Sequence, residues 1–284
     1  MRVSKFISRW FAVFALPTLT AFSLAFIVPF VLGLVLSFCK FTTVLNAKFI
    51  GTANYGKIFT ADSSFPHALG LTVLFALASV ASVNGIAFVL ALLLTRGLAG
   101  TNALRTVFFM PNLIGGIVLG YIWQQLLNGL LAPFDKTVQT SVGDGFWGMV
   151  VVFNWQMIGY MMIIYIAGIQ NVSGDVLEAA SIDGAGYFTT VFKILLPNLV
   201  PSITICTFLT LSQSFKMFDQ NLSLTAGQPG GATKLLALDI YDTFYNMGPA
   251  MRGVGQAKAV VFFVFVGVVA FLQLRATRSK EVEG

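Results

Sequence analysis

The residues that most often carry out catalysis are scarce in this sequence. The chain has one histidine, His67, and two cysteines, Cys39 and Cys206. A lone histidine without metal-ligand spacing around it supports neither a Ser/His/Asp or Cys/His catalytic set nor a metal site. The phosphate-binding pattern G-x-x-x-x-G-K-[ST] is absent, since the glycine-rich stretch 227–231 lacks the lysine–serine ending. We therefore expect no enzyme, no metal and no cofactor in this chain.

Polar residues inside apolar stretches indicate the binding of a solute instead. Asn112 follows a proline and precedes Gly115-Gly116, a combination that opens the backbone of a membrane helix. Such a break is tolerated only against protein or a water-filled cavity. Gln156 and Tyr160 lie on another apolar segment, and residues 210–221 become steadily more polar. These stretches predict the wall of an aqueous cavity inside a membrane protein.

The composition indicates that the chain folds within a lipid bilayer. Of the 284 residues, 57% are hydrophobic and only 10% are charged. A spanning helix needs about 20 mainly apolar residues. Six segments without Asp, Glu, Lys, Arg or His qualify, approximately 10–38, 69–94, 107–127, 147–168, 196–215 and 259–274. The first is too long for the apolar core of a cleaved signal peptide. The sequence predicts an all-α membrane protein with a single transmembrane domain over residues 1–284.

Small residues are frequent in the segment 69–94, and small faces let membrane helices approach closely. Asn84 lies near the middle of this segment, so we expect it to form a hydrogen bond with a neighbouring helix. Cys39 and Cys206 lie in or beside different spans and are predicted to be unpaired apolar residues.

The stretch from Glu178 to Pro197, EAASIDGAGYFTTVFKILLP, is the longest break in the apolar pattern that still predicts ordered structure. Asp175 is a predicted N-cap, with Glu178 at the third helical position. The glycines at 184–186 permit a sharp change of direction. A second series at helical spacing ends at Pro197 and comprises Phe188, Val191, Phe192 and Leu195. We expect two short helices and a glycine elbow on a polar loop, 169–197, which another protein would grip.

This stretch resembles the EAA loop of ABC-importer permeases. The match consists of Glu178-Ala179-Ala180, then Gly184 after three residues, then Ile194, Leu196 and Pro197 after nine more. The residues Asp183-Gly184-Ala185 and Phe192 resemble the carbohydrate branch, close to the maltose-type permease subunits. A helix that Glu178 merely caps would explain neither the spacing nor the polar context. The resemblance covers roughly residues 10–280 and implies the six-helix bundle of a type I ABC-importer permease.

The resemblance implies a division of work among subunits. A second similar permease, two cytoplasmic ATPase subunits that bind ATP and Mg²⁺, and an extracellular solute-binding protein would complete the importer. The loop 169–197 would be the coupling helix that docks on an ATPase, with contacts through Glu178, Ala179, Ala180, Asp183, Gly184 and Ala185. ATP binding would push these loops together and rock the spans between inward-open and outward-open states.

The maltose-type subunit lines its sugar site from three spans. A count without gaps from the EAA motif transfers those positions to Asn112, Gly116, Gln156, Met157, Tyr160, Thr210, Gln213, Ser214 and Met217. Apart from Tyr160 these residues mostly differ from the family's, so a different sugar or binding pose is expected. Amides and hydroxyls suit a neutral sugar, and a tyrosine ring suits its C–H face. We expect import of a sugar, an oligosaccharide in the first instance. A polyol, a sugar phosphate or an amino acid is the alternative solute, and Lys216 leaves room for an anion.

An ion-coupled secondary transporter is the alternative from another class. It would need ionisable residues at membrane depth, and the predicted spans have none. With six spans, both termini lie on the same side of the membrane. Six of the seven arginines also lie on that side, namely Arg2, Arg9, Arg96, Arg105, Arg275 and Arg278. That side is predicted to be the cytoplasmic face of a bacterial inner membrane. The net charge of +6 then reflects membrane topology and not a nucleic-acid partner.

Overall fold

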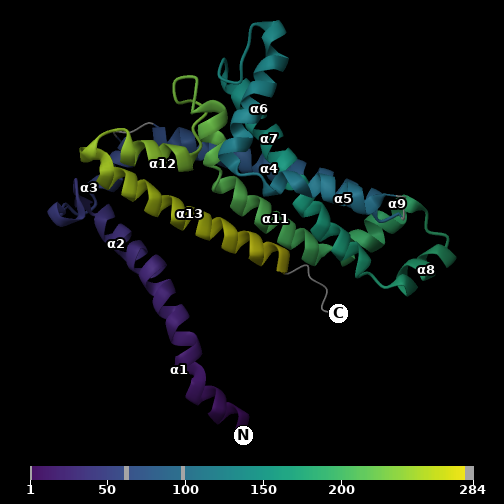
Figure 1. The fold of residues 1–284 in the computed structure, drawn as a ribbon. Helices are drawn as coiled ribbons and strands as arrows, with labels where there is room; N and C mark the ends of the chain where they lie inside the picture. Colours follow the sequence, from purple (N-terminus) through teal and green to yellow (C-terminus); the bar gives the residue numbers. More distant parts are fainter. Residues whose placement is uncertain (1, 61–63, 97–99, 279–284) are drawn as a thin grey trace. The chain divides into compact units, whose positions relative to one another are not determined.

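The computed structural model describes residues 2–60, 64–96 and 100–278 and is almost entirely helical (Figure 1). Among the described residues, β-structure is limited to Cys39–Lys40 (β1) paired antiparallel with Lys48–Phe49 (β2). The predicted all-α fold is confirmed. The chain divides into two compact units, Met1–Ser63 with Ile240–Phe263, and Ser64–Asp239 with Val264–Gly284. The end of the predicted cytoplasmic tail, residues 279–284, lies outside the described residues.

The first unit contains a long N-terminal helix interrupted by a π-helical turn. Its helices are α1 (Arg2–Phe22), α2 (Val28–Ser37) and α3 (Ala53–Thr60), and the π-helical turn is Ser23–Ile27. Pro29 has no N–H to donate to the carbonyl of Ala25, four residues earlier, so the ladder of hydrogen bonds is displaced at this turn.

Asn54 on α3 organises the polar contacts of the first unit. Its side-chain amide is buried and donates to the carbonyl oxygens of Ser37, at 2.8 Å, and Cys39, at 2.9 Å. Gly253 leaves room for that amide, because a Cβ there would lie 2.7 Å from the Asn54 Nδ2 atom. The two carbonyls lie at the last residue of α2 and two residues beyond it, where the helix itself provides no donor.

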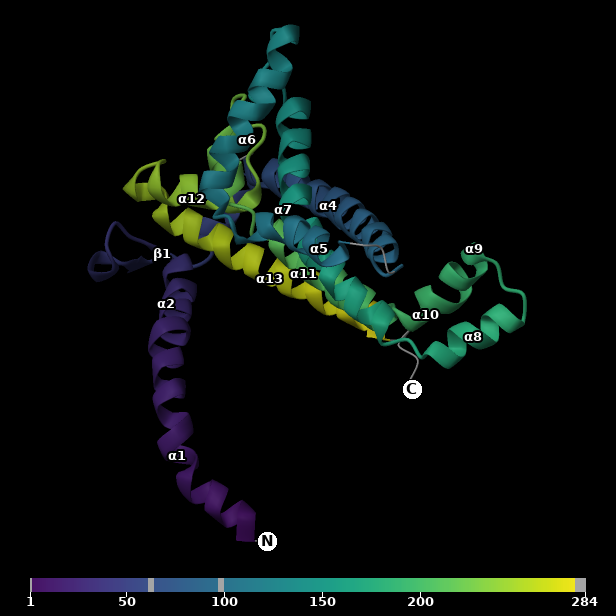
Figure 2. The same ribbon diagram turned by 45° about the vertical axis from the view of Figure 1, so that its right-hand side comes forward.

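The second unit is a bundle of long helices with shorter ones between them. Its elements are α4 (Ser64–Leu94), α5 (Thr101–Phe109), α6 (Gly116–Leu131), α7 (Val142–Gln170), α8 (Gly174–Ile182), α9 (Tyr187–Thr189), α10 (Leu196–Asn198) and α11 (Val200–Phe215). Two further helices, α12 (Leu236–Tyr245) and α13 (Arg252–Arg278), each contain residues of both units. In Figures 1 and 2, α6 and the first half of α7 rise side by side from the bundle.

The core of the second unit forms where α4, α7 and α11 pack together. Its fully buried side chains include Phe75, Val83, Met149, Met161, Met162 and Cys206. A series of hydrogen-bonded polar side chains crosses this apolar core. The Tyr165 hydroxyl donates to Asn84 Oδ1 at 2.9 Å, and Asn84 Nδ2 donates to Thr210 Oγ1 at 3.4 Å. The hydrogen bond predicted between Asn84 and a neighbouring helix is confirmed. Cys39 and Cys206 are both free and buried, as predicted.

Within the described residues, five helices are long and apolar enough to cross a membrane, namely Val13–Ser37, Ser64–Leu94, Gly116–Phe134, Val142–Gln170 and Pro249–Ala276. A sixth candidate is the pair Tyr187–Asn198 and Val200–Phe215, which meet at an angle of 71°. Pro201 lies at the start of α11, where a missing backbone donor costs little.

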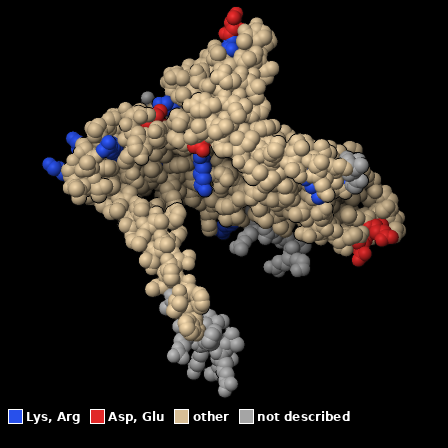
Figure 3. All heavy atoms as spheres, in the orientation of Figure 1, with Lys and Arg blue, Asp and Glu red and all other residues tan. Residues whose placement is uncertain are grey.

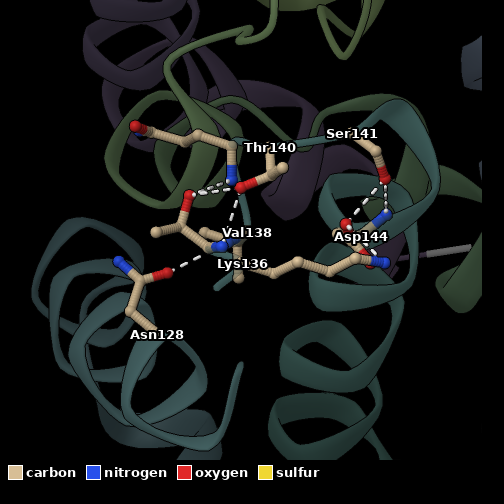
Figure 4. A network of polar contacts seen from close by, with 8 residues as sticks. Asn128, Lys136, Val138, Thr140, Ser141 and Asp144 are labelled. Carbon is tan, nitrogen blue, oxygen red and sulfur yellow. Dashed lines mark hydrogen bonds and ion pairs between the residues drawn. The ribbon is translucent and has the colours of Figure 1, made fainter. Parts of the chain in front are cut away.

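The connection between α6 and α7 is held by short-range polar contacts (Figure 4). Asn128 Oδ1 accepts a hydrogen bond from the Val138 amide at 2.9 Å. Ser141 caps α7 by accepting from the Asp144 amide at 3.1 Å, and Lys136 pairs with the Asp144 carboxylate at 3.8 Å. These contacts give the tip of the α6–α7 pair a defined shape.

Candidate functional site

A cavity of about 320 Å³ lies in the second unit, where three stretches of chain meet. The stretches are the break between α5 and α6, the middle of α7, and the end of α11 with the residues after it. The lining residues are Asn112, Gly116, Phe153, Gln156, Met157, Gln213, Lys216, Met217, Phe218, Asp219 and Gln220. Amide and charged groups dominate this set, which makes the cavity suited to a hydrophilic solute.

The first wall exists because the helix is broken between Phe109 and Gly116. Residues Met110–Leu113 form a 3₁₀ turn that includes Pro111, and Ile114 and Gly115 are extended. The break leaves the carbonyl of Ile114 without a helical donor, and Gln156 Nε2 on α7 donates to it at 3.2 Å. The backbone opening predicted from Asn112 and its neighbours is confirmed.

The third wall follows the end of α11 at Phe215. Gln220 is buried and its Nε2 donates to Gln156 Oε1 at 2.5 Å. Gln156 therefore bonds to both other walls. Asn221, next in the chain, is fully buried and holds the following loop, because its Oδ1 accepts from the Leu235 amide and its Nδ2 donates to the Thr233 carbonyl, both at 2.8 Å.

Six of the nine residues expected along the solute path lie around this cavity, namely Asn112, Gly116, Gln156, Met157, Gln213 and Met217. The other three do not line it. Thr210 is fully buried against Asn84, and the Ser214 hydroxyl donates to the Thr210 carbonyl at 2.7 Å. Tyr160 packs edge-on against Phe109. The role of any of the nine in transport stays a prediction.

Five lining residues were not among those nine, namely Phe153, Lys216, Phe218, Asp219 and Gln220. Most of them follow the end of α11, where the chain turns toward the cavity instead of continuing as a helix. The polar run 210–221 was the only sign of this in the sequence. The cavity also carries two charged residues, Lys216 and Asp219, whereas the nine expected residues are all uncharged.

The predicted glycine elbow is the turn of a helical hairpin, residues 173–198, which we call the Glu178 hairpin (Figure 2). Helix α8 is capped by Ser173, whose hydroxyl accepts from the Asp175 amide at 3.3 Å. The predicted cap at Asp175 is therefore wrong. Asp175 lies in the first turn, where its negative charge interacts favourably with the positive end of the helix dipole.

Helix α8 ends in a Schellman motif, in which Gly184 is the residue after the C-cap Asp183. The Ala185 amide donates to the Ala180 carbonyl at 2.9 Å, and the Gly184 amide donates to the Ser181 carbonyl at 3.1 Å. Gly184 has a φ of +75°, a conformation that costs any residue with a Cβ. The glycine therefore directs the chain back toward the second helix, Tyr187–Asn198.

The second helix of the hairpin is held on one side only. Val191, Leu195 and Leu199 are buried in a small apolar cluster. Phe188 and Phe192 are 73% and 60% exposed, so the four apolar residues expected as one series divide between two faces. The helix also continues through Pro197 to Asn198, one residue further than expected.

The surface of the Glu178 hairpin combines acidic and apolar side chains. Asp175, Glu178 and Asp183 are exposed, and Figure 3 shows acidic atoms gathered at this end of the second unit. Ala179 is exposed, Ala180 is buried and Ala185 is half-buried. The exposed Ile182 and Phe188 offer apolar area beside the carboxylates. No group of three or more His, Cys, Asp or Glu residues that could hold a metal ion occurs in the described ranges.

The model of the family called binding-protein-dependent transport system inner membrane component matches residues 84–279. The chain belongs to this family. It is a multi-pass inner-membrane permease of the ABC-importer class. The permease is 38% identical over 96% of both chains to the probable starch degradation products transport system permease protein AmyD of Thermoanaerobacterium thermosulfurigenes. It is 30% identical to the multiple sugar-binding transport system permease protein MsmF of Streptococcus mutans, over 99% of this chain and all of MsmF.

The fold of the permease is also found in solved structures. A crystal structure of a bacterial ABC transporter involved in the import of the acidic polysaccharide alginate superposes with a TM-score of 0.82 and 20% identity, over 98% of this chain and 99% of that one. A second structure of the alginate transporter, in complex with a periplasmic protein bound to an alginate pentasaccharide, gives the same TM-score over both whole chains. At this identity the likeness establishes the fold, which is that of a type I ABC-importer permease.

Proposed function

We propose that this permease forms half of the translocation path of an ATP-driven importer for sugars, and for oligosaccharides in particular. One observation carries the proposal: the break between α5 and α6 opens a cavity lined by the amides of Asn112, Gln156, Gln213 and Gln220. Carboxamides both donate and accept hydrogen bonds, as sugar hydroxyls do. The names of AmyD and MsmF support a sugar as the solute.

Energy would enter through the Glu178 hairpin. Its exposed carboxylates and phenylalanines form a surface suited to a protein groove, and Gly184 sets the angle between its helices. Two ATPase subunits would bind this hairpin and the corresponding loop of a second permease subunit. ATP and Mg²⁺ would be bound in those ATPase subunits, and this chain would hold no cofactor.

The proposed topology places both termini and the Glu178 hairpin in the cytoplasm. The positions of Arg96 and Arg105, at the end of α4 and in α5, support this orientation because arginine favours the cytoplasmic ends of spans. A solute-binding protein would then deliver the sugar from the opposite side.

A phosphorylated solute is the second candidate. Lys216 supports it, because its ammonium group is exposed and lines the cavity. The sn-glycerol-3-phosphate transport system permease protein UgpA of Agrobacterium fabrum is 28% identical to this chain over 83% of it.

The test is reconstitution of the permease with its partner subunits in proteoliposomes. ATP hydrolysis and uptake are measured with the binding protein loaded with maltotriose, raffinose or sn-glycerol 3-phosphate. We expect one neutral sugar to stimulate both activities. Stimulation by the phosphate alone would favour the second candidate. Solute movement by the purified chain without ATPase subunits would contradict ATP coupling and support the ion-coupled class.

A further inference from the structure

The cavity contains one carboxylate, that of Asp219, and one ammonium group, that of Lys216. Neither forms an ion pair with another described residue, whereas Lys136 and Asp144 at the tip of the α6–α7 pair do. The two opposite charges leave the cavity with no net charge, so its selectivity depends on hydrogen bonding more than on attraction of ions.

Gly116 provides the space that Asp219 occupies. A Cβ at position 116 would lie 2.7 Å from Asp219 Cβ and 3.1 Å from Asp219 Oδ2. The first distance is too short for two carbon atoms, so any other residue at 116 would displace the carboxylate. Gly116 begins α6 directly after the extended Gly115. The break in the helix and the position of the carboxylate are therefore coupled.

The backbone that carries Asp219 is held on both sides. The Ser223 hydroxyl donates to the Asp219 carbonyl at 2.7 Å. Gln220, the next residue, bonds to Gln156 on the opposite wall, and Asn221 is buried in its own hydrogen bonds. The backbone at Asp219 therefore needs little further ordering when the carboxylate binds a ligand.

A carboxylate only accepts hydrogen bonds, and bonds from a hydroxyl to a charged acceptor are shorter and stronger than neutral ones. A solute that satisfies Asp219 must therefore present hydroxyl or other donor groups. The amides of Asn112 and Gln213 line the same cavity and complement the remaining hydroxyl oxygens.

From this geometry we propose that Asp219 is a specificity-determining residue of the permease, which accepts hydrogen bonds from the hydroxyls of a neutral sugar while Gly116 keeps its carboxylate turned to the cavity. The proposal rests on the proposed function, since it assigns the sugar to this cavity.

The experiment compares four forms of the permease in the complete importer: wild type, Asp219→Asn, Gly116→Ala and Asp135→Asn. Asp135→Asn is the matched control, because it makes the same chemical change on an exposed turn outside the cavity. Asp219→Asn keeps the volume of the side chain, and Gly116→Ala keeps the charge but displaces it. The measurement is the amount of sugar moved per ATP hydrolysed, with the binding protein saturated by whichever of maltotriose and raffinose the wild type imports.

We expect Asp219→Asn and Gly116→Ala each to lower this ratio by about fivefold or more, since one charge-assisted hydrogen bond is lost. ATP hydrolysis stimulated by the loaded binding protein should persist, and Asp135→Asn should behave as wild type. If transport and hydrolysis instead fall together and their ratio is unchanged, Asp219 acts only on the structure of the permease. That result would overturn the proposal. An unchanged ratio in folded Asp219→Asn would also overturn it, while the proposed function would stand. If the wild type moves neither sugar, the proposed function itself fails, and this inference fails with it.

Discussion

The guanidinium carbon of Arg96 lies 4.4 Å from the centre of the Tyr187 ring. Arg96 lies two residues after the end of α4, and Tyr187 is the first residue of α9. This cation–π contact joins the end of a long bundle helix to the second helix of the Glu178 hairpin. We therefore expect it to transmit movement between the hairpin and the bundle.

Replacement of Tyr187 by leucine should weaken this link. An exposed cation–π contact contributes about 0.5–1 kcal/mol, so we expect stimulated ATP hydrolysis to fall about two- to fivefold in the reconstituted importer. Tyr187→Phe retains the ring face and should retain activity. Equal activity of the leucine and phenylalanine variants would show that the contact has no part in coupling.

Gly184 and Gly174 offer a matched pair at the two ends of α8. Neither would place a Cβ within 4 Å of other atoms, but only Gly184 has a positive φ, +75°. Gly184→Ala should cost about 1–2 kcal/mol in the hairpin turn and reduce uptake, while membrane insertion is unchanged. Gly174→Ala should transport as wild type. Uptake and the amount of inserted protein are measured together, and full uptake by Gly184→Ala would contradict the proposed role of the turn.

The hydrogen bond from Tyr165 to Asn84 should stabilise the packing of α7 against α4. In membrane proteins such bonds contribute about 0.6 kcal/mol on average and up to about 1.7 kcal/mol. A double-mutant cycle with Tyr165→Phe and Asn84→Ala, followed by unfolding in mixed micelles, measures this coupling energy. Additive effects of the two substitutions would mean that the bond contributes nothing.

Helix α7 packs closely against the end of α5 at Gly159. A Cβ there would collide with the carbonyl of Phe108 and would lie 2.8 Å from the Phe109 nitrogen. Because backbone atoms cannot rotate away, Gly159→Ala should lower stability by about 1–3 kcal/mol, seen as a lower Tm in detergent. Gly129→Ala on α6 meets nothing within 4 Å and serves as the control. A Tm for Gly159→Ala equal to that of the control would contradict this packing.

The sequence by itself determined the properties that depend on local composition and spacing. Long uncharged apolar segments require a membrane, and the residues from Glu178 to Pro197 form the predicted helix, elbow and helix because glycine at 184 allows the turn. The break near Asn112 was also predictable, since proline and glycine act on their own backbone. These features need no knowledge of what packs against them.

Only the tertiary structure decided which side chains share the cavity. Lys216 and Asp219 line it because α11 ends at Phe215 and the chain turns there, and Thr210 points into the core because Asn84 on α4 bonds to it. The same holds for the second hairpin helix, where Val191 is buried and Phe192 is exposed although both fit one apolar series. Helical spacing defines neighbours along one helix, whereas the orientation of a helix about its axis depends on partners distant in the sequence.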